Sequence, residues 1–185
     1  QYSVASFSYY DSGWKSSVYL YEKYNNTPLW YKEFEGYQGC VVISDDGNYI
    51  FASAGDNVYF FNRESNTPLW SKSLSSPARN EDRFGITSDR SLIVAAVTDT
   101  LYLFHKYNST EVWSADLGNT ILDCRISNDG NYIVAGTSSG TGNHKIHFFN
   151  RNSSSAIWTK TVDEEISSAD ISANGDYFGI GTNIN

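Results

Sequence analysis

The sequence is short of the residues that mark several protein classes: it has no methionine, two cysteines, three prolines and only 13 lysines and arginines. Two cysteines are too few for a disulfide-rich scaffold. The basic residues face 21 scattered aspartates and glutamates, so the net charge is −8 and no basic stripe exists to neutralise phosphates. We therefore expect no nucleic-acid partner.

Long hydrophobic runs are missing as well. No apolar segment approaches the roughly 18 to 20 residues that a transmembrane helix needs, so we expect a soluble chain without a membrane span. The chain begins with Gln1 and shows no signal peptide, and we expect a mature or truncated product whose leader lies outside the sequence shown. Cys40 and Cys124 occupy positions that do not match between repeats, which predicts buried free thiols rather than a disulfide.

Aromatic residues are abundant, with 14 tyrosines, 10 phenylalanines and 5 tryptophans, and four of the tryptophans end copies of one segment. These tryptophans lie 40, 43 and 45 residues apart, which is the spacing of a repeat whose units must stack to bury their apolar surfaces. The four copies are VYLYEKYNNTPLW (Val18–Trp30), VYFFNRESNTPLW (Val58–Trp70), LYLFHKYNSTEVW (Leu101–Trp113) and IHFFNRNSSSAIW (Ile146–Trp158).

Each unit predicts four strands, here named A to D in chain order. Strand A ends in Ile-Ser or Ile-Thr, a tight turn leads to strand B, a loop leads to strand C, and strand D carries the tryptophan. The A–B turns contain Asp46-Gly47, Asp129-Gly130 and Asn174-Gly175, pairs that favour hairpins because glycine accepts a positive φ. Asp89-Arg90 departs from this pattern and predicts a turn that is differently shaped or slightly strained.

Strand C is apolar or aromatic at successive positions, as in Val58, Tyr59, Phe60 and Phe61. A sheet with one wet face would alternate apolar with polar residues, so we expect each four-stranded sheet to be covered on both faces. Sheets stacked around an axis form an all-β propeller of four-stranded antiparallel blades, and a β-sandwich is the alternative. We expect one propeller region over residues 1–185, with units at about 1–35, 36–76, 77–118 and 119–163 and a partial unit at 164–185.

The repeat resembles two known kinds of propeller repeat. The N-T-P-L-W ending is similar to the T-G-x-x-x-W pattern of PQQ-like propellers, and the I-S-x-D-G-x-Y-I-x-A-G segment resembles the WD40-like repeats of archaeal and bacterial surface proteins. The resemblance covers essentially the whole chain. It implies that the strand-D tryptophan docks one blade against its neighbour, and it assigns this role to Trp30, Trp70, Trp113 and Trp158. Trp14 lies in the predicted B–C loop and takes no such role.

Departures from the family bear on chemistry. Quinoprotein dehydrogenases of this kind use adjacent cysteines and an acidic calcium cluster beside the cofactor, whereas the two cysteines here are 84 residues apart. The Trp-Asp ending and the Gly-His pair of WD40 repeats are absent too. No set of serine, cysteine or histidine recurs at matching strand ends to suggest nucleophilic catalysis. We expect no catalytic residue, no cofactor and no metal site.

The repeat begins and ends out of phase. Gln1–Ala5 aligns with a strand B, and the last segment, about Glu165 to Thr182, supplies a strand A and a strand B. Three explanations stay open: a window from a ring of six to eight blades, a closed four-bladed ring with one strand left over, or surplus strands that pair with a neighbouring subunit.

Three N-glycosylation sequons begin at Asn25, Asn108 and Asn152, and all fall in the predicted C–D turns. Such turns are exposed and can host a glycan, so these asparagines are glycosylation candidates if the protein is extracellular. The alternative is ordinary turn chemistry, in which Asn and Ser hydrogen-bond their own backbone.

Other polar clusters have simpler explanations than a site. Asp45-Asp46-Gly47-Asn48 lacks the bidentate Glu of a helix-loop-helix calcium site, which favours hairpin capping. Asp163-Glu164-Glu165 is expected in a solvated loop between blades. His144 and His147 are three residues apart on one strand and should point to opposite faces, where packing rather than metal binding is expected. A bend within 140–143 would be needed for them to share a metal.

From these patterns we expect a non-enzymatic extracellular or cell-surface propeller that acts as a structural or recognition module. Its partner would be a protein or glycan at the loop face, and the unpaired terminal strands also allow self-association. Two alternatives are a subunit of a surface filament or layer and a fragment of a larger propeller enzyme such as a quinoprotein.

Overall fold

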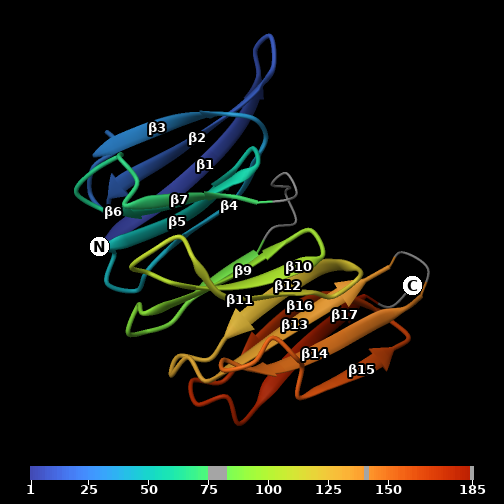
Figure 1. Cartoon of the computed structure of the whole chain (residues 1–185). Coiled ribbons are helices and arrows are strands. Elements are labelled where there is room, and N and C mark those ends of the chain that lie inside the picture. Colours follow the sequence, from blue (N-terminus) through green and yellow to red (C-terminus); the bar gives the residue numbers. More distant parts are fainter. Residues whose placement is uncertain (75–82, 140–141, 184–185) are drawn as a thin grey trace. The chain divides into compact units, whose positions relative to one another are not determined.

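A computed structural model describes residues 1–74, 83–139 and 142–183 and shows an all-β protein, as predicted. Within these ranges every regular element is a strand, and no helix is present that could cross a membrane. The chain divides into two compact units, residues 1–80 and 81–185, which are described separately (Figure 1). The predicted unit boundary at 76/77 lies outside the described residues.

The first unit contains two antiparallel sheets (Figure 1). The first sheet has the order β1-β2-β3 and the second has the order β4-β5-β6-β7. Their strands are β1 (Tyr2–Tyr10), β2 (Trp14–Glu22), β3 (Trp30–Glu35), β4 (Gln38–Ile43), β5 (Tyr49–Ala54), β6 (Asn57–Asn62) and β7 (Trp70–Ser73).

The second unit contains three antiparallel sheets, with the orders β8-β9-β10-β11, β12-β13-β14-β15 and β16-β17. We number the five sheets of the chain one to five in sequence order. The strands of this unit are β8 (Arg83–Ile86), β9 (Leu92–Val97), β10 (Thr100–His105), β11 (Glu111–Asp116), β12 (Thr120–Ile126), β13 (Tyr132–Ser138), β14 (His144–Asn150), β15 (Trp158–Val162), β16 (Glu165–Ile171) and β17 (Phe178–Asn183).

The predicted phase of the repeat is confirmed. The first sheet holds strands B, C and D, and the fifth sheet holds strands A and B, while the three sheets between them have all four strands. Adjacent strands within each sheet are consecutive in sequence and pair antiparallel, because short turns join them.

Successive sheets pack face to face through apolar side chains. We call the face that contacts the next sheet in sequence the leading face, and the face that contacts the preceding sheet the trailing face. Val18 and Leu20 on the leading face of the first sheet pack against Ala52 and Phe61 on the trailing face of the second. The third sheet packs on the fourth, and the fourth on the fifth, in the same sense.

The expectation that sheets are covered on both faces holds for the fourth sheet, whose trailing face packs on the third and whose leading face packs on the fifth. The first sheet has three strands, and on its trailing face Phe7 is 57% exposed and Tyr31 is 52% exposed.

The A–B turns share one hydrogen-bonded geometry. In each turn a Ser or Thr hydroxyl donates to the carboxylate or amide oxygen two residues later, as from Ser127 to Asp129 at 2.6 Å. Gly175 has a φ of +74°, and an added Cβ there would lie 2.5 Å from the ring of Tyr132. Both the backbone conformation and the lack of space therefore require glycine at this position. Arg90 adopts the same conformation with a φ of +62°. The Asp89-Arg90 turn therefore keeps the common shape and carries backbone strain.

Trp14 is placed differently from the prediction. It is the first residue of β2 and pairs with Tyr10, so the segment between strands B and C is a long hairpin rather than a loop. The strands β1 and β2 have nine residues each, whereas β5 and β6 have six. Strand β1 continues through Ser8, Tyr9 and Tyr10, which adds three cross-strand pairs with β2 at this end of the sheet.

Candidate functional site

Two of the strand-D tryptophans, Trp30 and Trp113, connect their sheet to the next one by a hydrogen bond. The indole Nε1 of Trp30 donates to the carbonyl of Arg63 at 2.6 Å, and that of Trp113 donates to the carbonyl of Arg151 at 2.7 Å. Each acceptor directly follows strand C of the next sheet. The same hydrogen bond, from the strand-D indole to the carbonyl that follows strand C of the next sheet, therefore occurs in both units.

The other two tryptophans make stacking contacts. Trp70 stacks on Phe60 of its own sheet, with ring centroids 5.4 Å apart. Trp158 stacks on Phe148 of its own sheet at 5.5 Å and lies 5.7 Å from Phe178 of the fifth sheet. Trp158 thus reaches the next sheet through ring contact.

An aromatic cluster occupies the end of the β1–β2 hairpin, which projects past β3 (Figure 1). The rings of Tyr10 and Trp14 meet edge to face at 5.7 Å, and those of Trp14 and Tyr37 at 4.7 Å. Tyr10 is 71% exposed and Trp14 is 48% exposed. We call these three residues the hairpin-tip cluster. Sequence reasoning missed it, although the unusual spacing between Tyr2 and Val18 was a usable signal.

A second group of rings covers the trailing face of the first sheet. Tyr19 stacks on Tyr31 at 5.5 Å and on Tyr21 at 6.2 Å, and Phe7 meets Tyr19 edge to face at 5.8 Å. The hydroxyl of Tyr9 donates to Glu33 at 3.3 Å. Desolvation and the neighbouring Glu33 carboxylate raise the pKa of Tyr9. The face combines rings with acidic groups.

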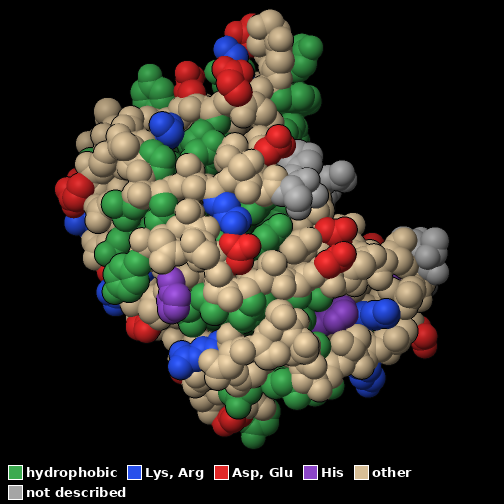
Figure 2. Space-filling model, viewed as in Figure 1, with side chains coloured by type: hydrophobic (Ala, Val, Ile, Leu, Met, Phe, Trp, Pro, Cys, Tyr) green, Lys and Arg blue, Asp and Glu red, His purple; other side chains and the backbone are tan. Residues whose placement is uncertain are grey.

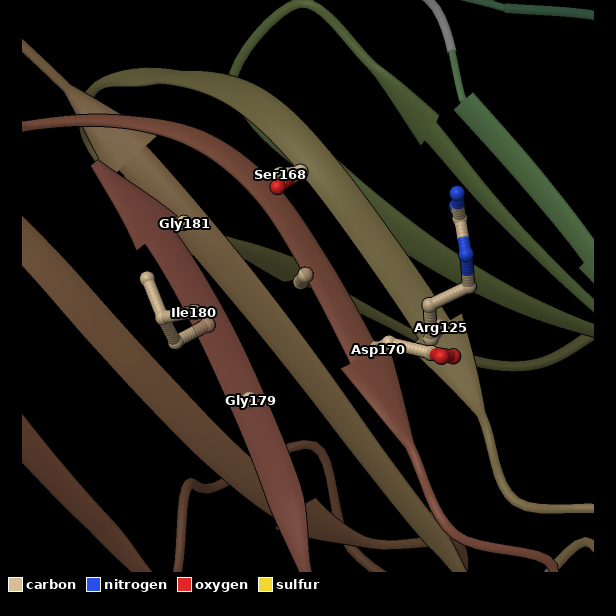
Figure 3. A pocket seen from close by; sticks show the side chains of 7 residues that line it. Arg125, Ser168, Asp170, Gly179, Ile180 and Gly181 are labelled. Carbon is tan, nitrogen blue, oxygen red and sulfur yellow. The ribbon is translucent and has the colours of Figure 1, made fainter. Parts of the chain in front are cut away.

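An open hollow of about 470 Å³ lies on the fifth sheet (Figure 3). Ser168 and Asp170 of β16, Gly179 and Gly181 of β17 and Arg125 of β12 line it. The Arg125 guanidinium donates to Asp123 at 2.6 Å and to the carbonyl of Cys124 at 2.8 Å.

The buried Asp123 carboxylate links the inner strands of two sheets. Besides Arg125, it accepts a hydrogen bond from the backbone N–H of Ala169 in β16 at 2.9 Å. A buried carboxylate needs such partners because desolvation alone would disfavour its charged form. This arrangement holds β16 against β12 and serves structure; it also sets Arg125 at the side of the hollow.

The three sequon asparagines are exposed and lie between strands C and D. The Oδ1 atoms of Asn25 and Asn108 accept hydrogen bonds from the backbone N–H two residues later, at 2.9 and 3.0 Å. Asn152 makes no equivalent contact, because Ser153 holds the matching place and its hydroxyl accepts from Ser155. Only two of the three sequons therefore share one turn position.

The histidines of β14 are both buried. His147 contacts the hydroxyls of Thr137 at 3.3 Å and Thr159 at 3.1 Å, and burial followed by the nearby Lys145 charge lowers its pKa. The Nδ1 of His144 has no hydrogen-bond partner in the part of the chain that the structure describes. In that same part no three metal-ligating side chains gather. The loop that would have to bring the two histidines together falls partly outside the described residues.

The acidic turns are capped hairpins. Asp46 accepts from the Ser44 hydroxyl at 2.7 Å and from the Asn48 backbone at 3.1 Å, so its carboxylate satisfies its own turn. Equivalent hydrogen bonds, first from Thr87 and Ser127, lower the pKa values of Asp89 and Asp129. Asp163 and Glu164 are exposed, and Glu165 begins β16.

Charged side chains form no patch on the visible face in Figure 2, where Lys and Arg are dispersed among neutral groups. The two cysteines form no disulfide, as predicted; Cys124 is also buried as predicted, whereas Cys40 is only half-buried. The two surfaces that stand out are the hairpin-tip cluster in the first unit and the hollow in the second.

A family model described as "Outer membrane protein assembly factor BamB" matches residues 15–179. A search of curated proteins finds no match. Many solved structures do match, among them Kuenenia stuttgartiensis hydrazine synthase, with a TM-score of 0.71 and 13% identity over 89% of this chain. A chain from a crystal structure of the mitotic checkpoint complex has a TM-score of 0.66 and 11% identity over 91% of this chain.

At these identities the structural matches bear on the fold alone, and together with the family model they confirm a PQQ-like β-propeller repeat protein. The chain spans about half the length of the structures that it matches, 49% in one case and 57% in the other.

Proposed function

Because the chain belongs to the PQQ-like propeller family described as "Outer membrane protein assembly factor BamB", we propose that it is a non-catalytic binding module outside the cytoplasm whose partner is a protein. The family description supports an extracytoplasmic role. The observation that carries the proposal is the hairpin-tip cluster of Tyr10, Trp14 and Tyr37, which no other described hairpin of the repeat reproduces.

The chemistry of the hairpin tip suits protein recognition. Tyrosine and tryptophan are enriched in protein interfaces, where a rigid ring buries a large area at little cost in side-chain entropy. Edge-to-face contacts among the three rings hold them in place before binding. The turn of the hairpin contains Asp11, Ser12 and Gly13, small or polar residues that leave the rings accessible.

Site-specific crosslinking tests this function. Trp14 is replaced by the photoreactive amino acid benzoylphenylalanine in the full chain, and the same replacement at Tyr177, which is 78% exposed in the other unit, serves as the control. Exposure to the envelope fraction of the producing cells should give a discrete crosslinked protein from position 14 only. Loss of that product in the Tyr10→Ser, Tyr37→Ser background would support the cluster, and identical products from both positions would overturn it.

The extracellular assignment has its own test. We propose that Asn25 and Asn108, which share one exposed turn geometry, carry glycans in the secreted protein. Intact mass before and after enzymatic deglycosylation should differ, and the Asn25→Gln, Asn108→Gln variant should show no difference. An unchanged mass of the protein from its natural source would end this assignment.

The non-catalytic assignment is tested with pyrroloquinoline quinone and calcium. We expect calorimetric titration of the folded chain with both to show no saturable heat. Saturable binding would favour the alternative of a fragment of a larger propeller enzyme.

A further inference from the structure

We propose that the hairpin-tip cluster binds an extended, proline-rich segment of the partner that also carries lysine or arginine. This inference rests on the proposed function and adds to it the conformation and the charge of the bound segment. It follows from the shape of the aromatic surface, from an indole N–H that is available as a donor, and from the charge beside the rings.

The cluster lies beyond the ordinary length of a sheet in this repeat. In the three four-stranded sheets the pairing of strands B and C ends at one place, which is held by Ala54–Asn57, Val97–Thr100 and Thr137–Lys145. The first sheet continues for three pairs beyond the matching place, as far as Tyr10 and Trp14. A sheet of ordinary length that packed on either face would stop short of these rings. Their exposure is therefore a property of the long hairpin.

The rings of the cluster form a stepped surface because they meet at nearly right angles. The ring plane of Trp14 is inclined by 78° to that of Tyr10 and by 76° to that of Tyr37. Aromatic surfaces of this kind accept polyproline II segments, in which three residues make one turn and proline rings recur along each edge. Such a segment loses little entropy on binding, because its extended conformation exists beforehand.

Trp14 also supplies a hydrogen-bond donor. Its indole Nε1 has no acceptor among the described residues, whereas the indoles of Trp30 and Trp113 donate to carbonyls of the next sheet. Because Trp14 is 48% exposed, this N–H is available to a partner. A polyproline II segment has no internal hydrogen bonds, so its carbonyls are available as acceptors. The indole donor and these acceptors complement each other.

Acidic groups beside the rings favour a basic residue in the partner. Asp11 in the turn has 71% of its side chain exposed, and Glu35 is exposed at the end of β3. Lys15 pairs with both: its ammonium lies 3.9 Å from the Asp11 carboxylate, and it stands opposite Glu35 in the strand register. Two carboxylates thus share one ammonium. The tip keeps a negative charge that a lysine or arginine of the partner neutralises.

A second copy of these residues does not fit the site. The three prolines of the sequence, Pro28, Pro68 and Pro77, are isolated from one another, so residues 1–185 contain no proline-rich segment. The net charge of −8 also disfavours approach of a second copy to an acidic tip. The bound segment therefore belongs to a different protein.

Titration of the isotope-labelled chain, followed by nuclear magnetic resonance, tests the inference. The probe is an oligoproline peptide that ends in lysines, and the control peptide has the same charges with glycine and serine in place of proline. The indole N–H signal of Trp14, identified by its loss in Trp14→Phe, should shift saturably with the probe only. The indole signals of Trp30 and Trp113 should stay in place. No shift of the Trp14 signal, or an equal shift with the control peptide, overturns the inference.

Variants separate the rings from the charges. Tyr10→Ser should weaken binding of the probe by about tenfold or more, as expected when an aromatic residue at the centre of an interface is lost. Asp11→Asn combined with Glu35→Gln should weaken it by about two- to fivefold at low salt, and added salt should reduce that difference. Asp163→Asn combined with Glu164→Gln, an exposed acidic pair of the other unit, is the matched control and should bind like the native chain. Equal affinities throughout, in variants with the native far-UV circular dichroism spectrum, would contradict the assigned surface.

A chitin oligosaccharide is the third probe, because exposed rings also stack on sugars. A saturable shift of the Trp14 signal with the sugar and none with the peptide overturns the inference. The titration uses the purified chain, whereas the crosslinking experiment uses the envelope fraction, so the two can fail separately. Crosslinking from position 14 without a peptide-induced shift overturns this inference and leaves the proposed function in place. A shift without a crosslinked product supports the binding chemistry and overturns the proposed envelope partner.

Discussion

The first and fourth sheets are built from the same repeat yet present different surfaces. The fourth sheet is covered on both faces, and Phe149 on its trailing face is 1% exposed. The first sheet is covered on one face, and its trailing side shows Phe7 and Tyr31 to solvent. The two trailing faces also differ on strand D, in the residue that pairs with the aromatic strand-C residue. Thr159 there accompanies a covered face, and Tyr31 an exposed one.

Truncation of one ring on each sheet gives the largest expected contrast. Phe149→Ala should lower the free energy of unfolding by about 3–5 kcal/mol, because it removes a buried ring that stacks on Trp113 and leaves a cavity. Tyr31→Ala should change it by less than about 0.5 kcal/mol, because that ring is half exposed. Urea denaturation at low protein concentration measures both. Equal losses would remove the distinction between the two sheets.

Removal of an indole N–H sharpens the comparison at the outer strands. Trp113→Phe keeps the ring contact with Phe149 but loses the hydrogen bond to the carbonyl of Arg151, so we expect a loss of about 1 kcal/mol. Trp158→Phe is the matched control, because Trp158 makes no such bond within the described ranges and is 37% exposed. Urea denaturation should show a smaller loss for the control, and a larger one would contradict the assigned role of the bond.

His147 of the fourth sheet occupies the position that Tyr19 occupies in the first sheet. Because histidine titrates near neutral pH and tyrosine does not, we expect this position to make stability depend on pH in the fourth sheet only. Burial and then Lys145 lower the pKa of His147 below 6.5, so the unfolded chain takes up its proton at a higher pH than the folded chain. The stabilising contribution is present above pH 6.5 and is lost as the pH falls from 6.5 toward the folded pKa. The melting temperature should fall less between pH 6.5 and lower pH in the His147→Tyr variant than in the native chain. If both proteins show the same dependence of melting temperature on pH, His147 is not the cause of the loss.

The smallest effect concerns the turns. Arg90 is the residue with positive φ at a place where the second and fourth sheets have Gly47 and Gly130. Arg90→Gly should therefore raise the free energy of unfolding by about 0.5–1 kcal/mol, because glycine relieves the strain of the left-handed conformation. Gly130→Arg, the reverse exchange in the matching turn, should destabilise. Thermal melts of both variants check the prediction, and a loss of stability in Arg90→Gly would contradict it.

Much of the fold could be predicted because the sequence contains four copies of the repeat at a nearly constant spacing. The turn glycines, the phase of the first and last units and the free cysteines followed from alignment of the units with one another. Alignment assumes that equivalent residues have equivalent surroundings. That assumption failed for the first sheet, where Phe7 and Tyr31 stand at places that hold Ala54 and Ser71 in the second sheet and are exposed.

The candidate surfaces were harder to predict because they depend on departures from the repeat. Trp14 was assigned to the B–C loop, whereas β1 and β2 extend to nine residues each; the long spacing between Tyr2 and Val18 was a signal of this extension. The hollow is lined by Gly179 and Gly181, and glycines in a strand do not by themselves indicate a hollow. The pairing of β16 with β17 places both glycines on one face, where they leave space.

The hydrogen bonds of Trp30 and Trp113 have a consequence during synthesis on the ribosome. Trp30 emerges 33 residues before Arg63, and Trp113 emerges 38 residues before Arg151. The outer strands of the first and third sheets therefore lack this hydrogen bond until strand C of the next sheet has left the exit tunnel. A pause in translation just after either tryptophan would leave that indole without its carbonyl for as long as the pause lasts.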